Sequence, residues 1–130
     1  MPAVSAEVEQ LLTSDPPHAA YLSTCTEGRP HVAPVWYRYE DGTVEIVTTG
    51  RKLANLRDNP RVSLAVSAET GGVPEWTVTL RGTATVVDDR ELTQEANARI
   101  NRRYGMPEDA WAENVLVRIA VGSASLRTYD

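Results

Sequence analysis

The sequence predicts a mainly β domain, folded as a small closed antiparallel barrel with a few short helices. About six apolar, β-rich segments follow one another after residue 19, and several are joined by short turns such as "EDG" at 40–42. Strands joined by short turns pair antiparallel. Few helical patterns interrupt them, and closure into a barrel removes exposed strand edges. A β-sandwich is the main alternative.

The first part of the chain predicts one short helix and three strands. Apolar residues at helical spacing share one face over 4–13, and "SDPP" at 14–17 ends this helix. Strands are expected at 19–26, 31–39 and 43–49. Pro34 lies within the second strand and removes a hydrogen-bond donor. An edge strand tolerates such a proline, as does a strand whose backbone faces a ligand.

The remaining chain predicts two helices and three or four strands. The helices span 51–59 and 90–104, and a loop is expected at 69–74. Strands are expected at 61–68 and 75–87, and one or two at 115–129. Gly82 indicates a bulge or bend in its long strand. These six or so strands fit the barrel, and we take six as the predicted count.

The helix at 90–104 has the clearest end signals. Asp88 and Glu91 resemble a capping box at its start. Arg102 and Arg103 lie at its negative end, and Gly105 provides the stop. These signals place the helix between the fifth and sixth predicted strands.

Composition excludes several classes of function. The 130 residues suit one domain, which we expect to span 1–130. A net charge of −5 argues against nucleic acid and against anionic membranes as partners. No apolar run approaches the ~20 residues of a membrane span, and the first residues lack the features of a signal peptide. We therefore expect a cytoplasmic protein.

Motifs for metal binding and for nucleophilic catalysis are missing from the sequence. His18, His31 and Cys25 show no metal-binding spacing, and both histidines are interpreted as structural. Cys25 lies in an apolar run, which indicates a small buried residue. The sequence also has no GxSxG elbow, and capping explains its serines and carboxylates. Catalytic residues are therefore not assigned.

The segment "TTGRKLANL" at 48–56 has the composition of a phosphate site. Thr48 and Thr49 end a strand, and Arg51 and the only lysine, Lys52, begin the next helix. Two cations at the positive end of a helix are locally unfavourable, and a bound phosphate reverses this. The alternative is two solvated cations, paired with acids such as Glu45 or Asp58.

The segment "RPHVAPVWYRY" at 29–39 supplies a flat apolar surface. Pro34 and Trp36 share a face with Val32, while Val35 and Tyr37 lie on the other face. Such a surface beside a phosphate site suits a phosphorylated aromatic cofactor. Ordinary barrel packing is the alternative.

These two segments resemble the pyridoxamine 5′-phosphate oxidase-like superfamily, and more closely its small flavin- or deazaflavin-binding members. The resemblance covers residues 22–67 and 80–89 and the closing "SLRTYD", with "GRP", "PVW", "TTGRK" and "NPRVSL" in the same order. It implies a six-stranded split β-barrel that forms a homodimer, with cofactor sites between protomers. It also implies an oxidoreductase that transfers hydride at FMN or, alternatively, at coenzyme F420.

The resemblance also implies roles for individual residues. It assigns the cofactor phosphate to Thr48, Thr49, Arg51 and Lys52, with Asn55 supporting the loop. The cofactor ring is assigned to the strand backbone at 34–36 (Pro34, Val35 and Trp36), and Trp76 is the candidate that closes the site from the partner protomer.

The reaction partners are expected to be a small planar or unsaturated organic substrate and, for the flavin, a nicotinamide reductant. The chain lacks the long C-terminal substrate-binding segment of true pyridoxamine phosphate oxidases, which argues against that specific activity. The alternatives are a non-catalytic flavin binder, a haem binder with His18 or His31 as ligand, and a barrel without cofactor.

Overall fold

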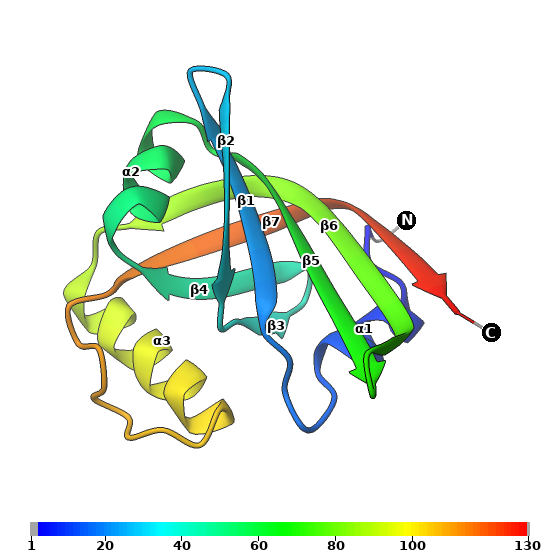
Figure 1. The fold of residues 1–130 in the computed structure, drawn as a ribbon. Coiled ribbons are helices and arrows are strands. Elements are labelled where there is room, and N and C mark those ends of the chain that lie inside the picture. Colours follow the sequence, from blue (N-terminus) through cyan, green and yellow to red (C-terminus); the bar gives the residue numbers. More distant parts are fainter. Residues whose placement is uncertain (1–2, 130) are drawn as a thin grey trace.

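The computed structural model describes residues 3–129, which form a barrel built from one seven-stranded antiparallel sheet (Figure 1). The mainly β prediction is confirmed. The order of strands in the sheet is β2-β1-β5-β6-β7-β4-β3. The strands are β1 (Ala20–Thr26), β2 (Arg29–Val35), β3 (Arg38–Glu40), β4 (Thr43–Thr48), β5 (Arg61–Thr70), β6 (Val73–Val87) and β7 (Val115–Thr128). The helices are α1 (Ala6–Leu12), α2 (Gly50–Asp58) and α3 (Arg90–Arg103).

The strand expected at 31–39 is two strands, so the predicted count of six is wrong by one. β2 pairs with β1 and β3 pairs with β4, at the two opposite edges of the sheet. The chain passes between these edges through only Trp36 and Tyr37. This short connection brings the two edges together and closes the sheet into a barrel. Pro34 lies on the edge strand β2, as its missing donor predicts.

The barrel is filled by the inward residues of its strands, and α1 packs against this core. Val8 and Leu12 of α1 belong to the same buried cluster as Leu22, Ile46 and Leu64. The helix predicted at 4–13 is confirmed, and its apolar face contacts the core as expected. α2 and α3 lie on the other side of the barrel from α1 in Figure 1.

Gly82 marks the predicted irregularity of β6. The register between β6 and β7 shifts between Arg81 and Gly82. A Cβ atom on Gly82 would lie 2.3 Å from the carbonyl oxygen of Ala120, which is closer than any side chain tolerates. Glycine is therefore required here because the backbone of β7 approaches too closely.

Two local predictions are corrected. The N-cap of α3 is Asp89, whose carboxylate accepts a hydrogen bond from the Leu92 N–H at 3.0 Å. Asp88 instead forms an ion pair with Arg57. The loop expected at 69–74 is a tight hairpin, since β5 ends at Thr70 and β6 begins at Val73. Gly71 and Gly72 both have positive φ, which lets the chain turn in two residues.

Candidate functional site

The site is a cavity that opens where β2 separates from β4. Arg38 pairs with Glu45 in the β3–β4 ladder, and this register would place Trp36 opposite Val47 if it continued. It does not continue, because β2 turns away to pair with β1. The two strands therefore diverge, and the space between them is not filled by a neighbouring strand.

The cavity has a volume of about 370 Å³, which is within the range of small-molecule sites. Its walls come from both diverging strands, from the start of α2 and from α3 with the loop that follows it. The lining residues are Ala19, Pro34, Val35, Trp36, Val47, Thr48, Thr49, Lys52, Ile100, Asn101, Trp111 and Asn114. Two segments predicted from the sequence, at 34–36 and 48–52, thus meet at one cavity.

One end of the cavity is polar and is formed by the start of α2. Thr48, Thr49 and Lys52 line it. Thr49 is the N-cap of α2, yet its side chain makes no capping hydrogen bond. By contrast, Ser5 caps α1 and Asp89 caps α3 through their side chains. The first N–H groups of α2 thus lack a side-chain acceptor, as expected where an external anion binds.

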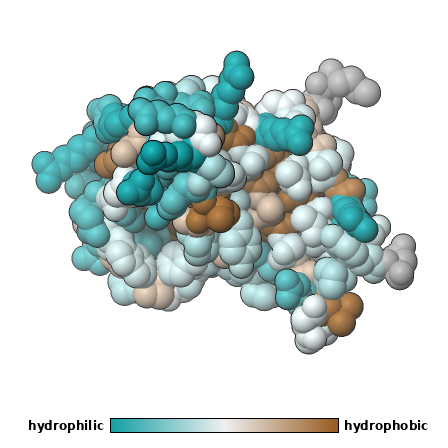
Figure 2. All heavy atoms as spheres, turned by 45° about the horizontal axis from the view of Figure 1, so that its top comes forward, coloured by the Kyte–Doolittle hydropathy of each residue, from teal (hydrophilic) through white to brown (hydrophobic). Residues whose placement is uncertain are grey.

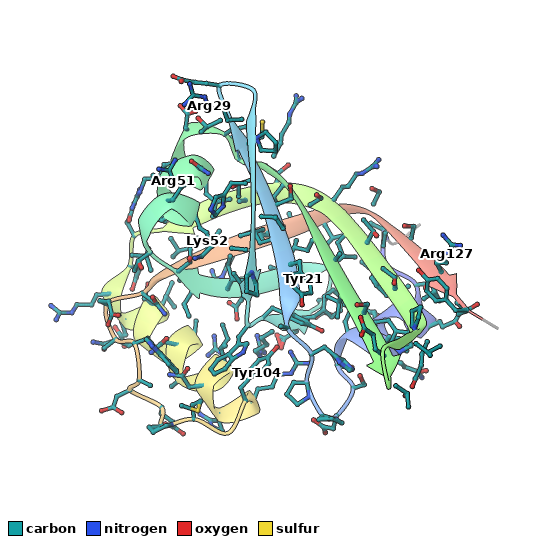
Figure 3. The ribbon with its side chains drawn as sticks, in the orientation of Figure 1. Tyr21, Arg29, Arg51, Lys52, Tyr104 and Arg127 are labelled. Atoms are coloured by element: carbon teal, nitrogen blue, oxygen red, sulfur yellow. The ribbon has the colours of Figure 1, made fainter. Side chains whose placement is uncertain are left out.

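Arg51 and Lys52 differ in position although they are adjacent in sequence. Lys52 is half-buried and lines the cavity, whereas Arg51 is exposed on the outer side of α2 (Figure 3). Among residues 3–129, neither cation forms an ion pair with a carboxylate. The acids considered as their partners are engaged elsewhere, Glu45 with three arginines and Asp58 with the hydroxyl of Thr26.

Two further predicted residues lie away from the cavity lining. Asn55 is buried, and its side-chain N–H donates to the hydroxyl of Thr24 at 3.1 Å. This bond ties α2 to β1 and so supports the position of the helix. Trp76 is partly buried, and its ring packs edge-to-face with the ring of His18, with the two ring centroids 5.4 Å apart. Trp76 does not line the cavity of its own protomer, so its place in the site depends on a dimer.

The other end of the cavity is aromatic. The indole of Trp36 stacks on the ring of Tyr104, with centroids 4.6 Å apart and planes 4° apart. The hydroxyl of Tyr104 donates to the carbonyl of His18 at 2.6 Å. Burial raises the pKa of Tyr104 to about 12, so its hydroxyl stays protonated. The neutral ring of Tyr104, which is labelled in Figure 3, therefore covers one face of the Trp36 indole and fixes its orientation.

Sequence reasoning missed the residues that α3 and its following loop bring to the cavity. Ile100 and Asn101 of α3, and Trp111 and Asn114 of the loop, complete the aromatic end. Only Trp111 carried a signal, because an isolated tryptophan in the polar stretch "MPEDAWAEN" has no periodic reason to be buried. The packing of α3 beside β4 could not be derived from its own periodicity.

The chemistry of this lining suits a phosphorylated ring cofactor. No histidine and no carboxylate is among the lining residues that the structure describes. Within residues 3–129, no three histidine, cysteine or acidic side chains gather in a way that could hold a metal ion. The cationic end and the flat apolar walls of the cavity fit a phosphate and a planar ring.

The family assignment follows from comparison with known proteins. A family model described as pyridoxamine 5′-phosphate oxidase matches residues 4–124. The chain belongs to the pyridoxamine 5′-phosphate oxidase family. Curated proteins give no match to this chain.

Solved structures agree with membership of the pyridoxamine 5′-phosphate oxidase family and show the split barrel. A FAD-binding protein from Mesorhizobium loti is 25% identical with a TM-score of 0.79, over 98% of this chain and 96% of that one. An F420 reductase is 25% identical with a TM-score of 0.77, over 94% and 98% of the two chains. A conserved hypothetical protein from Mycobacterium tuberculosis is also 25% identical, with a TM-score of 0.78 over 98% and 87%.

None of the three helices in residues 3–129 combines the length and the apolar character needed to cross a membrane.

Proposed function

We propose that the protein is a flavin- or deazaflavin-dependent oxidoreductase, with its cofactor held in the cavity between β2 and β4. The observation that carries this proposal is that one cavity has a cationic, polar end and an apolar, aromatic end. Lys52 and the uncapped start of α2 form the end for a phosphate, and Trp36 with Pro34 and Val35 forms the end for a ring. A single ligand that carries both groups satisfies both ends.

The cofactor, when bound, supplies hydride chemistry, in which two electrons and one proton pass together between its ring and a substrate. The protein contributes binding and orientation. Thr48 and Thr49 offer hydroxyl groups, Lys52 offers a positive charge, and the strand at 34–36 orients the ring. Arg51 adds positive potential from the outer side of the helix rather than a contact within the cavity.

We propose FMN as the cofactor, with F420 as the alternative. Both carry a phosphate and a three-ring system. Similar proteins of this family include a FAD-binding protein and an F420 reductase, which supports a flavin or deazaflavin in general. The proposed substrate is a small planar or unsaturated organic molecule, and the proposed reductant of a bound flavin is a nicotinamide.

We also propose that the protein is a homodimer. On the outer face of the sheet, Val32 of β2 is 66% exposed and Tyr21 of β1 is 51% exposed, with exposed Pro34 beside Tyr21 in the ladder. Figure 2 shows hydrophobic surface in the middle of the molecule, bordered by hydrophilic residues. A second copy that covers this face removes apolar surface from water. Light scattering of the purified protein tests this, and a monomeric mass at micromolar concentration contradicts it.

The decisive experiment compares ligands with and without the phosphate. The purified protein is titrated with FMN, riboflavin, F420 and haem, and binding is followed by absorbance and fluorescence. We expect FMN or F420 to bind, and riboflavin to bind about 100-fold more weakly than FMN, because it lacks the charge-assisted contacts at Lys52. Failure of both FMN and F420 to bind contradicts the proposal.

A non-catalytic flavin carrier is the second candidate. Lys52 is the only ionisable side chain among the described lining residues, so the protein offers little acid–base assistance. The rate at which a nicotinamide reduces the bound flavin, and the rate at which a quinone reoxidises it, distinguish an oxidoreductase from a carrier. A carrier gives the same two rates as free flavin. Haem is less well supported, because neither His18 nor His31 lines the cavity.

A further inference from the structure

Trp111 is an exposed aromatic residue at the mouth of the cavity. Its side chain lines the cavity although the residue is 47% exposed. Its indole lies perpendicular to that of Trp36, at 86° with centroids 5.5 Å apart. A planar ring that stacks on the free face of one indole therefore directs its edge at the other indole, and stacked and edge-to-face contacts are the two favoured aromatic geometries.

The loop that carries Trp111 is held by α3. Two buried asparagines of the helix, Asn97 and Asn101, donate side-chain N–H bonds to the carbonyl of Ala110 at 2.8 and 2.9 Å. Asn101 also donates to the carbonyl of Glu108 at 3.2 Å. The residue immediately before Trp111 is thus fixed by a double hydrogen bond. Such buried polar contacts define one position for the loop.

The backbone of Trp111 is itself unusual. Its φ of +54° lies in the left-handed region, which bulky residues rarely adopt. The N–H of Asn114 donates to the carbonyl of Trp111 at 3.1 Å, and the N–H of Ala110 donates to the carbonyl of Pro107 at 3.1 Å. Backbone hydrogen bonds thus hold the chain on both sides of Trp111. The contact with Trp36 covers only part of the Trp111 ring, which is still 47% exposed despite this unfavourable backbone conformation. Strain of this kind is expected where a residue serves a ligand.

We propose that Trp111 is a specificity-determining residue, which forms an aromatic wall at right angles to Trp36 in the site for the planar ring of the cofactor. The ligand class is a conjugated, flat, multi-ring system, here the isoalloxazine or deazaflavin. Asn97 is a positioning residue, which acts through the loop and does not line the cavity. This inference rests on the proposed function, since it concerns the ring whose phosphate lies at Lys52.

The test measures equilibrium binding to the protein without cofactor, using Trp111→Ala and three probes. We expect FMN and riboflavin both to bind about tenfold more weakly, because one aromatic wall is lost from the ring. Inorganic phosphate is expected to bind within twofold of wild type. Lys52→Ala is expected to weaken the binding of FMN and of phosphate and to leave riboflavin binding unchanged. Riboflavin and phosphate therefore respond in opposite ways to the two variants. If F420 binds in place of FMN, it and its phosphate-free deazariboflavin replace the two flavins.

Controls separate a local effect from a folding defect. Met106→Ala is the matched control, because Met106 is an exposed apolar residue of the same loop that does not line the cavity. We expect this variant to bind all probes as wild type does. Trp111→Phe keeps an aromatic wall and is expected to recover most of the lost affinity. A thermal melt of each variant confirms that it is folded.

Asn97→Ala tests the positioning role in a double-mutant cycle. Alone it is expected to weaken FMN binding about threefold, because the loop loses one of its two anchors at Ala110. Combined with Trp111→Ala it is expected to add nothing, since the ring it positions is then absent. Additive losses in the double variant overturn the assignment of Asn97.

The outcomes distinguish the two proposals. If wild type binds FMN or F420 but Trp111→Ala binds it within twofold of wild type, the inference is wrong and the proposed function stands. Equal weakening of phosphate and riboflavin also overturns the inference, because the effect is then not specific to the ring. If wild type binds neither FMN nor F420, the proposed function and the inference both fail.

Discussion

Two groups of basic side chains lie near β4, one beside the middle of the strand and one just after its end, and they differ in whether a carboxylate is present. In the first, Glu45 of β4 is flanked in register by Arg38 of β3 and Arg118 of β7. Arg38 donates to it at 2.9 Å, Arg118 at 3.1 Å, and Arg99 of α3 lies 3.5 Å away. The Glu45 side chain is only 7% exposed. In the second group, Arg51 and Lys52 follow β4 without any such partner in the described residues.

This difference separates cations that stabilise the fold from cations available to a ligand. Glu45 is the shared ion-pair partner of one arginine each from β3, β7 and α3, and it ties these elements to β4. Those arginines therefore have their partner within the chain. Lys52 lies at a helix start where the backbone dipole opposes its charge, and nothing in residues 3–129 compensates it. Lys52 is distinguished by two features together, since it forms no ion pair within residues 3–129 and its side chain lines the cavity.

The largest effect on stability is expected from Glu45→Gln, which removes the carboxylate from the first group. Three arginines, whose side chains are 27%, 35% and 40% exposed, then lose their common partner, and we expect the free energy of unfolding to fall by about 2 kcal/mol. Urea unfolding measures this. Glu40→Gln is the control, because Glu40 pairs with Arg38 but is 63% exposed, and its loss is expected to cost less than about 1 kcal/mol. Similar losses in the two variants would remove the distinction between the groups.

The next effect concerns the second group and is a loss of binding rather than of stability. Arg51→Ala with Lys52→Ala is expected to weaken FMN binding about 100-fold, because the phosphate loses both of its cationic neighbours. Arg57→Ala is the matched control, since Arg57 is on the same helix but at its other end, paired with Asp88. Isothermal titration measures both variants. Unchanged affinity in the double variant shows that the phosphate is not bound at α2.

The contrast between the groups also shows what could be predicted from sequence. Most strands and the role of Gly82 follow from local patterns, and the structure agrees with them, except that the strand predicted at 31–39 is two strands. The local pattern at 48–52 also found residues that line the cavity, while their binding of a phosphate stays a prediction. The partners of Glu45 do not follow, because Arg38, Arg99 and Arg118 reach it only through strand order and helix packing. Trp111 was missed for the same reason. Local pattern finds the polar end of the cavity, and tertiary packing supplies its aromatic end.

A smaller effect is expected from pH. Burial tends to raise the pKa of Glu45, but the hydrogen bond from Arg118 and the charges of Arg99, Arg38 and Arg118 outweigh it, so the pKa lies below its ordinary value of 4.5. The stability that Glu45 contributes is therefore present above the ordinary value and is lost as pH falls through the lowered one. We expect the melting temperature of wild type to fall more steeply than that of Glu45→Gln below about pH 4.5. Parallel curves contradict this.

The smallest effect tests the electrostatics of α2 without any ligand. Lys52→Ala removes a cation from the positive end of the helix, so we expect the protein without cofactor to become more stable by about 0.3–1 kcal/mol. Added salt should reduce this gain, because it screens the helix dipole. Saturating FMN should reverse its sign, since the bound phosphate stabilises wild type more than the variant. A variant that is less stable than wild type both with and without FMN would show that Lys52 serves the fold, and the two groups of cations would then not differ in kind.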